Sequence, residues 1–128
     1  MFDKYMICED SVHNLERDGE TVGFALQARL PYYRGLGLSM VEEIGLEIDG
    51  QAIPREAIRF SVRGKSWTLD EMEVEYTERW NFGEKADIHV LQPGGLKAGP
   101  HQVKLSERLR ISYLPFVPTT KDEKTIVI

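Results

Sequence analysis

Tight-turn dipeptides set between short alternating segments are the feature that most limits how this chain folds. Asp18-Gly19 and Asp49-Gly50 each supply residues that readily adopt the positive φ angles of a two-residue hairpin turn. Residues 21–30 and 41–49 flank these turns and alternate apolar with polar side chains, as half-buried strands do. The sequence therefore predicts antiparallel hairpins.

The same pattern continues along the chain and predicts the fold class. We expect about eight to ten short strands, turn signals about every 8–12 residues, and almost no helix. This combination is typical of an all-β protein, an antiparallel β-sandwich of jelly-roll-like form. Residues 1–128 are predicted to form one domain.

Three segments carry more specific structural predictions. Residues 70–80 fit both a helix and a strand, and we expect a short helical turn at residues 69–72 followed by extended chain. Residues 101–113 are predicted to be the longest strand, with Glu107-Arg108 interrupting its apolar face as a bulge. The apolar residues 125–128 predict a last strand.

Charge and cysteine content restrict the class of function and the compartment. A net charge of −5 argues against nucleic acid as a partner. A single cysteine, Cys8, excludes an internal disulfide, fits a reducing compartment, and is expected to be a small buried hydrophobe. The sequence shows neither a signal-peptide pattern nor a run of about 18 apolar residues, so we expect a soluble, cytoplasmic protein.

Candidate metal ligands and catalytic acids are weakly patterned. The three histidines are far apart in the sequence, and only Asp87 and His89 share one strand face, where a solvated face is the better interpretation. A run of carboxylates could hide a catalytic pair, but such runs usually form a solvated face. We predict no metal ligand and no catalytic residue in this chain. The carboxylates in question are Asp70, Glu71, Glu73, Glu75 and Glu78.

Three aromatic residues, Trp67, Tyr76 and Trp80, offer an alternative function. Together they could form a platform on which a sugar ring stacks, as in a free-standing carbohydrate-binding module. They could equally pack in the core or against a sheet, and this interpretation is favoured.

An apolar, aromatic connection at residues 30–40 is the strongest candidate for a functional surface. It either fills the end of the sandwich or anchors an interface, and the residues alone leave both open. Its glycines permit unusual backbone angles and close approach of another surface. A second Leu-Pro-aromatic stretch at residues 114–116 could lie beside it and extend the patch. The candidate residues are Tyr32, Tyr33, Arg34, Gly35, Leu36, Gly37, Leu38, Pro115 and Phe116.

Several stretches in a fixed order resemble one known family. They are Met1-Phe2-Asp3-Lys4-Tyr5, Ile7-Cys8-Glu9-Asp10-Ser11, Pro31-Tyr32-Tyr33-Arg34-Gly35-Leu36-Gly37-Leu38-Ser39-Met40, Pro54-Arg55-Glu56, Arg59-Phe60-Ser61-Val62, Thr68-Leu69-Asp70-Glu71-Met72, Trp80 with Phe82-Gly83-Glu84, and Leu109-Arg110-Ile111-Ser112-Tyr113. In this order they resemble the small β subunit of C-glycoside deglycosidases. Residues from 118 onward contribute nothing to the resemblance.

The resemblance implies a β-sandwich subunit of a heteromeric lyase. In that family a larger α subunit of the TIM-barrel type carries a divalent metal, typically manganese, and the acid–base residues. The complex cleaves the C–C bond between the sugar and the aromatic aglycone of 3-oxo-C-glycosides. The β subunit is then expected to hold no cofactor and to be inactive alone. Its expected role is to support the α subunit and shape the pocket that receives the C-glycoside.

Overall fold

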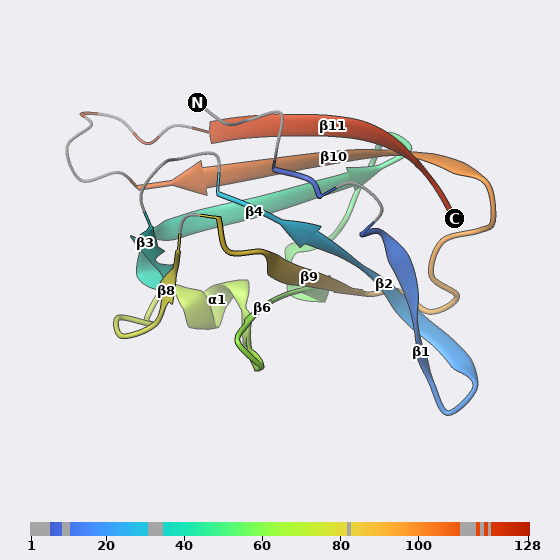
Figure 1. Cartoon of the computed structure of the whole chain (residues 1–128), viewed down its shortest axis with the longest axis horizontal. Coiled ribbons are helices and arrows are strands. Elements are labelled where there is room, and N and C mark those ends of the chain that lie inside the picture. The colour runs from blue at the N-terminus through green and yellow to red at the C-terminus, as the bar shows by residue number, and fades with distance from the viewer. Residues whose placement is uncertain are drawn as a thin grey trace.

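Two antiparallel sheets face each other in the computed structural model, which describes residues 6–8, 11–30, 35–81, 83–110, 115, 117 and 119–128 (Figure 1). One sheet has the order β1-β2-β9-β6-β7, formed by His13–Arg17, Glu20–Ala28, Ala86–Leu91, Ile58–Val62 and Lys65–Thr68. The other has the order β11-β10-β4-β5, formed by Thr119–Val127, Pro100–Leu109, Val41–Ile48 and Gln51–Ala52. A two-stranded ribbon pairs β3, Leu36–Gly37, with β8, Arg79–Trp80.

This architecture confirms the predicted antiparallel β-sandwich. The described residues form eleven strands, which is more than expected. Three of them, β3, β5 and β8, are only two residues long, too short to show an alternating pattern in the sequence. No helix within the described residues is long and apolar enough to cross a bilayer.

The predicted hairpin turns form at both Asp-Gly pairs. Asp18 and Gly19 have φ angles of 52° and 80°, and Asp49 and Gly50 have φ angles of 51° and 84°. A third pair, Arg63 with Gly64, has the same signs. Two consecutive positive φ angles match the right-handed twist of the flanking strands. These turns therefore connect β1 to β2, β4 to β5, and β6 to β7.

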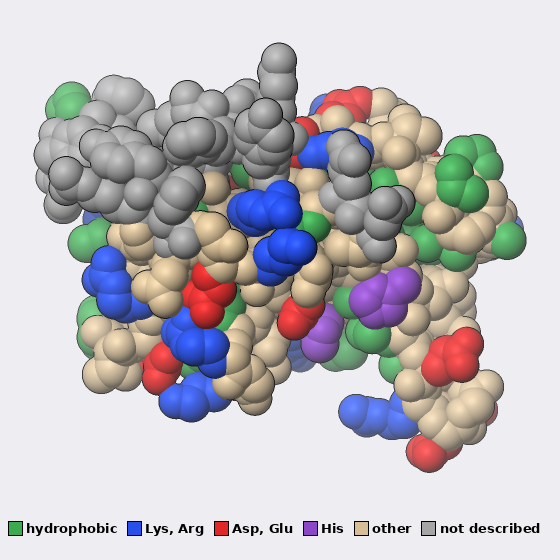
Figure 2. Space-filling model, in the orientation of Figure 1, with side chains coloured by type: hydrophobic (Ala, Val, Ile, Leu, Met, Phe, Trp, Pro, Cys, Tyr) green, Lys and Arg blue, Asp and Glu red, His purple; other side chains and the backbone are tan. Residues whose placement is uncertain are grey.

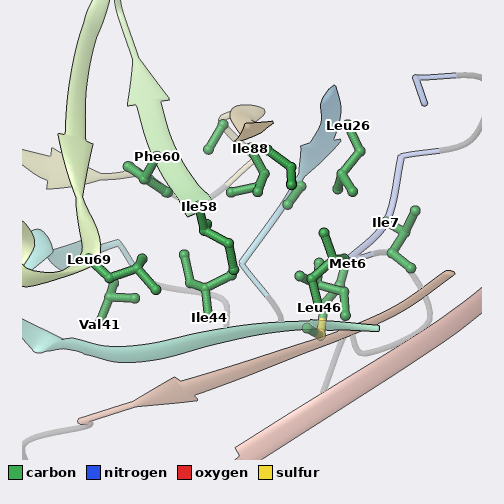
Figure 3. Close-up of a cluster of buried hydrophobic side chains, with 14 of the residues drawn as sticks. Met6, Ile7, Leu26, Val41, Ile44, Leu46, Ile58, Phe60, Leu69 and Ile88 are labelled. Atoms are coloured by element: carbon green, nitrogen blue, oxygen red, sulfur yellow. The ribbon is translucent and has the colours of Figure 1, made fainter. Parts of the chain in front are cut away.

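The core lies between the two sheets and is built from the predicted inward faces. Figure 3 shows Leu26 of β2, Ile58 of β6 and Ile88 of β9 on one side, with Ile44 and Leu46 of β4 on the other. All five side chains are buried, with exposures of 3% or less. Because apolar burial drives folding, this interdigitated layer fixes how the two sheets face each other.

The helical turn predicted at residues 69–72 is present as α1, Leu69–Met72. Thr68 caps it: its hydroxyl accepts a hydrogen bond from the Glu71 backbone N–H, and the Glu71 carboxylate accepts one from the Thr68 backbone N–H. This capping box satisfies two donors at the helix start. Single 3₁₀ turns occur at Arg55–Ala57 and at Leu38–Met40.

The longest strand is β10, as predicted, and an irregularity in its pairing lies beside the predicted bulge at Glu107-Arg108. A register shift against β4 lies between Arg108 and Leu109. Glu107 nevertheless keeps the alternation of its strand and points inward, with an exposure of only 1%. Within the described residues β10 ends at Leu109, and the predicted extension over residues 111–113 lies outside them.

The last strand is longer than predicted, because β11 begins at Thr119 rather than at residue 125. The charged residues of β11 can join the sheet because the carboxylate and ammonium groups that point inward are hydrogen-bonded. The Asp122 carboxylate accepts hydrogen bonds from the Ile7 backbone N–H and from the Lys124 ammonium, both at 2.9 Å. Cys8 lies beside this contact and is buried, as predicted, and burial raises the pKa of its thiol.

Candidate functional site

The β3–β8 ribbon brings together two segments that are 42 to 44 residues apart in the sequence. Leu36 pairs with Trp80, and Gly37 pairs with Arg79. The contact continues beyond the ribbon, because the Leu38 backbone N–H donates to the Glu78 carbonyl at 3.0 Å. Figure 1 shows the ribbon at one end of the sandwich, next to α1. Part of the apolar 30–40 connection therefore rests on residues 75–80.

The two glycines of this connection differ from the sequence-based interpretation. Neither Gly35 nor Gly37 has a positive φ angle. Gly37 has an extended backbone, with a φ angle of −65°. Gly35 instead allows a close approach: a Cβ built on it would lie 3.0 Å from the Trp80 carbonyl oxygen. The neighbouring surface is the chain's own backbone. At Gly37 the nearest atom would be 3.9 Å away, so a side chain fits there.

The candidate residues of the two loops are only partly described. Leu36 and Leu38 are buried in the core, with exposures of 7% and 0%, so their side chains fill the end of the sandwich. Pro115 is exposed. Four further candidates, Tyr32, Tyr33, Arg34 and Phe116, lie outside the described residues. The interface role of this loop stays a prediction.

Glu75 holds the segment that packs on the loop. Its carboxylate accepts hydrogen bonds from the Thr77 backbone N–H at 3.1 Å and the Thr77 hydroxyl at 2.9 Å. It also accepts one from the Trp67 indole N–H at 3.2 Å. The two bonds from Thr77, backbone first, are the main causes that lower the pKa of Glu75. The Ser39 backbone N–H donates to the Glu75 carbonyl, so this residue is fixed on both sides.

The residues on either side of Glu75 point outward. Val74 is 67% exposed and Tyr76 is 76% exposed. We call residues 73–78 the ridge. The predicted helical turn, α1, ends at Met72, which is buried. The end of the helix sends the next two apolar side chains to the surface.

Ion pairs attach the ridge to the sheets. Arg55 bridges Glu43 at 2.5 Å, Glu73 at 3.0 Å and Asp70 at 3.1 Å. Glu78 pairs with Lys65 at 2.8 Å. Figure 2 shows acidic and basic side chains interspersed around α1 and β8. The predicted solvated acidic face is present, since the side chains of Asp70 and Glu73 are 86% and 58% exposed. Its carboxylates also pair with cations that are distant in the sequence, Arg55 of the 3₁₀ turn and Lys65 of β7.

Glu78 also receives a bond from Arg63 at 3.2 Å. Hydrogen bonds from Lys65 and then Arg63 lower the pKa of its carboxyl, which keeps Glu78 ionised and bonded.

A cleft of about 430 Å³ adjoins the ridge and is lined by Ser39, Glu42, Glu73, Tyr76 and Arg110. Glu42 pairs with Arg110 at 2.7 Å across it. Hydrogen bonds from Arg110 and then from Arg108 lower the pKa of Glu42. The wall of the cleft is therefore charged, and Tyr76 is its aromatic edge. Sequence reasoning missed this pair, since nothing local links residue 42 to residue 110.

The three aromatic candidates do not share a platform. Trp80 is fully buried, its ring packs edge-on against Phe60 at 5.0 Å, and its indole N–H donates to the Glu84 carbonyl. Trp67 is half-buried and lies 6.4 Å from the same Phe60 ring. Only Tyr76 is fully on the surface. The favoured packing interpretation is thus correct for Trp80, and a sugar cannot stack on it.

His101 and Asp87 take part in contacts that hold the fold together. One ring nitrogen of His101 bonds to the Asp49 carboxylate at 2.7 Å and the other bonds to the Lys97 carbonyl at 2.6 Å. These acceptors, the carbonyl first, raise the pKa of His101. Asp87 accepts a hydrogen bond from Gln27. Within the part of the chain that the structure describes, no three His, Cys, Asp or Glu residues gather as a metal would need.

Fold and surface together define a class of protein: a β-sandwich that exposes a valine and a tyrosine at one end, on a segment held by hydrogen bonds. Residues 2–113 match the family described as C-glycoside deglycosidase beta subunit. The chain belongs to this family, as the resemblance in the sequence predicted.

Curated relatives agree with this assignment. A C-glycoside deglycosidase beta subunit of Eubacterium cellulosolvens is 36% identical over 77% of this chain and 67% of its own length. A 3'-dehydrocarminate deglycosidase beta subunit of a Microbacterium species is 34% identical over 90% of this chain and 83% of its own. A C-glycoside deglycosidase beta subunit of Arthrobacter globiformis is 30% identical over 75% of this chain and 74% of its own length.

Proposed function

We propose that this chain is the β subunit of a cytoplasmic, heteromeric C-glycoside deglycosidase. It supports a metal-dependent α subunit of the TIM-barrel type and shapes the pocket that receives the substrate. The observation that carries the proposal is the family match over residues 2–113, because the matching relatives are named as beta subunits of such enzymes. A subunit with this name acts with a partner.

The proposed reaction is a lyase cleavage of 3-oxo-C-glycosides. The name of the Microbacterium relative specifies a 3'-dehydro compound, in which a carbinol has lost two hydrogens to become a ketone. A ketone acidifies the neighbouring C–H: a base removes this proton, and the C–H electron pair forms a C=C bond to the carbon that carried the aglycone. The aglycone leaves with the electron pair of the C–C bond and takes up a proton from a general acid. The divalent metal of the α subunit, manganese by the family resemblance, would stabilise negative charge on oxygen.

The contribution of this chain is to help position the substrate and to exclude water from the site. A barrel enzyme has its site at the C-terminal face of the barrel strands, where a partner can cover it. The end of the sandwich that carries the ridge suits that role, since hydrogen bonds of Glu75 and ion pairs of Arg55 tie its loops to both sheets. A cover that excludes water strengthens the electrostatic interactions inside the site.

Co-expression with the α subunit tests the proposal. The two chains should elute together in size exclusion, and their complex should release the aglycone from a 3-oxo-C-glycoside. This chain alone should release no aglycone. Full activity of the α subunit without this chain would refute the obligate β-subunit role. Sugar binding by this chain alone, measured by calorimetry, would instead support the carbohydrate-binding alternative.

A further inference from the structure

The ridge has the composition of an interface centre. Val74 and Tyr76 expose about two thirds or more of their surface, and they lie two residues apart on one outward-facing segment. Tyrosine is enriched at protein interfaces because it supplies a large contact area at little conformational cost. Among the residues that the structure describes, the other exposed large apolar side chains, Leu91 and Val127, belong to β9 and β11 rather than to this segment.

The backbone beneath these two side chains is already ordered. Glu75 between them accepts hydrogen bonds from Trp67 and Thr77 and bonds through its carbonyl to Ser39. Binding of a partner over Val74 and Tyr76 therefore costs little conformational entropy in this segment. With that cost low, more of the free energy gained by burying apolar area contributes to affinity.

Charge indicates what kind of surface covers the ridge. Residues 70–78 contain five carboxylates and no Lys or Arg. Arg55 and Lys65 offset part of this charge. The carboxylates of Glu71 and Glu75, in contrast, accept hydrogen bonds from neutral donors: a backbone N–H for Glu71, and Thr77 and Trp67 for Glu75. The complementary surface is an apolar socket with Lys or Arg at its rim.

We propose that the ridge, residues 73–78, is the docking surface of this chain for the α subunit, with Val74 and Tyr76 seated in an apolar socket rimmed by basic side chains. The inference rests on the proposed function, because it takes the α subunit as the occupant. It places the contact at the end of the sandwich that carries the β3–β8 ribbon, with the Glu42–Arg110 cleft at its edge.

The test compares exposed positions of the same kind. Val74→Asp and Tyr76→Ser change the ridge, and Val127→Asp changes a valine that is 75% exposed on β11. Each variant is co-expressed with the α subunit, and the fraction of complex is measured by mass photometry over a dilution series. We expect each ridge variant to raise the Kd at least about tenfold, as for the loss of an interface hot spot. Val127→Asp should change the Kd less than about twofold.

The outcomes separate the two proposals. If the unchanged chain forms no complex with the α subunit, the proposed function fails and the docking surface fails with it. If that complex forms and turns over substrate, but the ridge variants dissociate like the control, only the docking surface is overturned. The same holds if Val74→Asp abolishes self-association of this chain and leaves α-subunit binding intact. Weaker binding of the complex at high salt is expected, since the rim contacts are ionic.

Discussion

Glu107 offers the sharpest test of the physical reasoning about the core. Its side chain lies between the sheets, flanked on its own face by Ile44 of β4 and Thr120 of β11 in the strand register. Neither carboxyl oxygen has a hydrogen-bond partner among the described residues. Burial, and then the nearby Asp122 charge, raise the pKa of Glu107 well above its usual value. We therefore expect a neutral carboxylic acid at this position.

Replacing this acid with an amide should remove a pH dependence. A carboxyl whose pKa is higher in the folded than in the unfolded state binds more protons when folded. The free energy of unfolding then falls as pH rises above the unfolded pKa, by at most about 1.4 kcal/mol per pH unit, until the folded pKa is passed. Glu107→Gln cannot ionise, so its stability relative to the unchanged chain should grow over that range.

A second variant separates ionisation from the cost of a buried polar group. Glu107→Met has a similar length and no unsatisfied oxygen, so it should be more stable than the unchanged chain even at pH about 4, by roughly 1–3 kcal/mol. At that pH Glu107→Gln should differ from the unchanged chain by less than about 1 kcal/mol, since both carry a neutral polar group.

Urea unfolding from pH about 5 to 8 measures the effect, with Glu16→Gln as control because Glu16 is an exposed strand carboxylate. The difference between Glu107→Gln and the unchanged chain should widen with pH, and the control difference should stay nearly constant. A difference that is constant, or that shrinks as pH rises, would refute the claim that Glu107 is buried and neutral.

Three further predictions concern local contacts. The Lys97 carbonyl and the Asp49 carboxylate raise the pKa of folded His101, so the stability that they add should be present below pH about 6.5 and lost as pH rises through the folded pKa. In thermal unfolding, the difference between the unchanged chain and His101→Gln should therefore be larger at pH 6 than at pH 9. Gly35→Ala should cost about 1–3 kcal/mol because its Cβ meets the neighbouring backbone at 3.0 Å, whereas Gly37→Ala should be nearly neutral in urea unfolding. Thr68→Ala should cost about 1 kcal/mol through the lost cap, and Thr68→Ser should restore most of it.

Much of the sandwich could be read from local chemistry. Asp18-Gly19 and Asp49-Gly50 specify tight turns through the backbone preferences of two residues, and both turns form as predicted. The start of α1 is encoded equally locally, by Thr68 and Glu71 three residues apart. Alternation placed Ile44 and Leu46 on the inward face correctly. Family membership also followed from the sequence, since many short matches in one order are more specific than any single one.

The parts that were missed depend on distant residues. A run of acidic residues looks the same in the sequence whether it is solvated or paired, and the cation that pairs with Glu73, Arg55, comes from another loop. A glycine kept for a close approach, such as Gly35, resembles one kept for a turn. The polar Glu107 was interpreted as a break in the inward face because burial of a carboxyl is costly and therefore rarely expected.

For the ridge, the sequence by itself determined the residue types: two apolar side chains on either side of an acid, in a stretch without Lys or Arg. Only the tertiary structure decided which of these side chains is exposed to water. α1 ends at Met72, and β8 pairs with a strand 42 to 44 residues earlier. In this arrangement Glu75 is half-buried, whereas Val74 and Tyr76 are exposed. The physical reason is that turn and cap preferences act over a few residues, whereas side-chain exposure depends on which distant strand the sheet brings alongside.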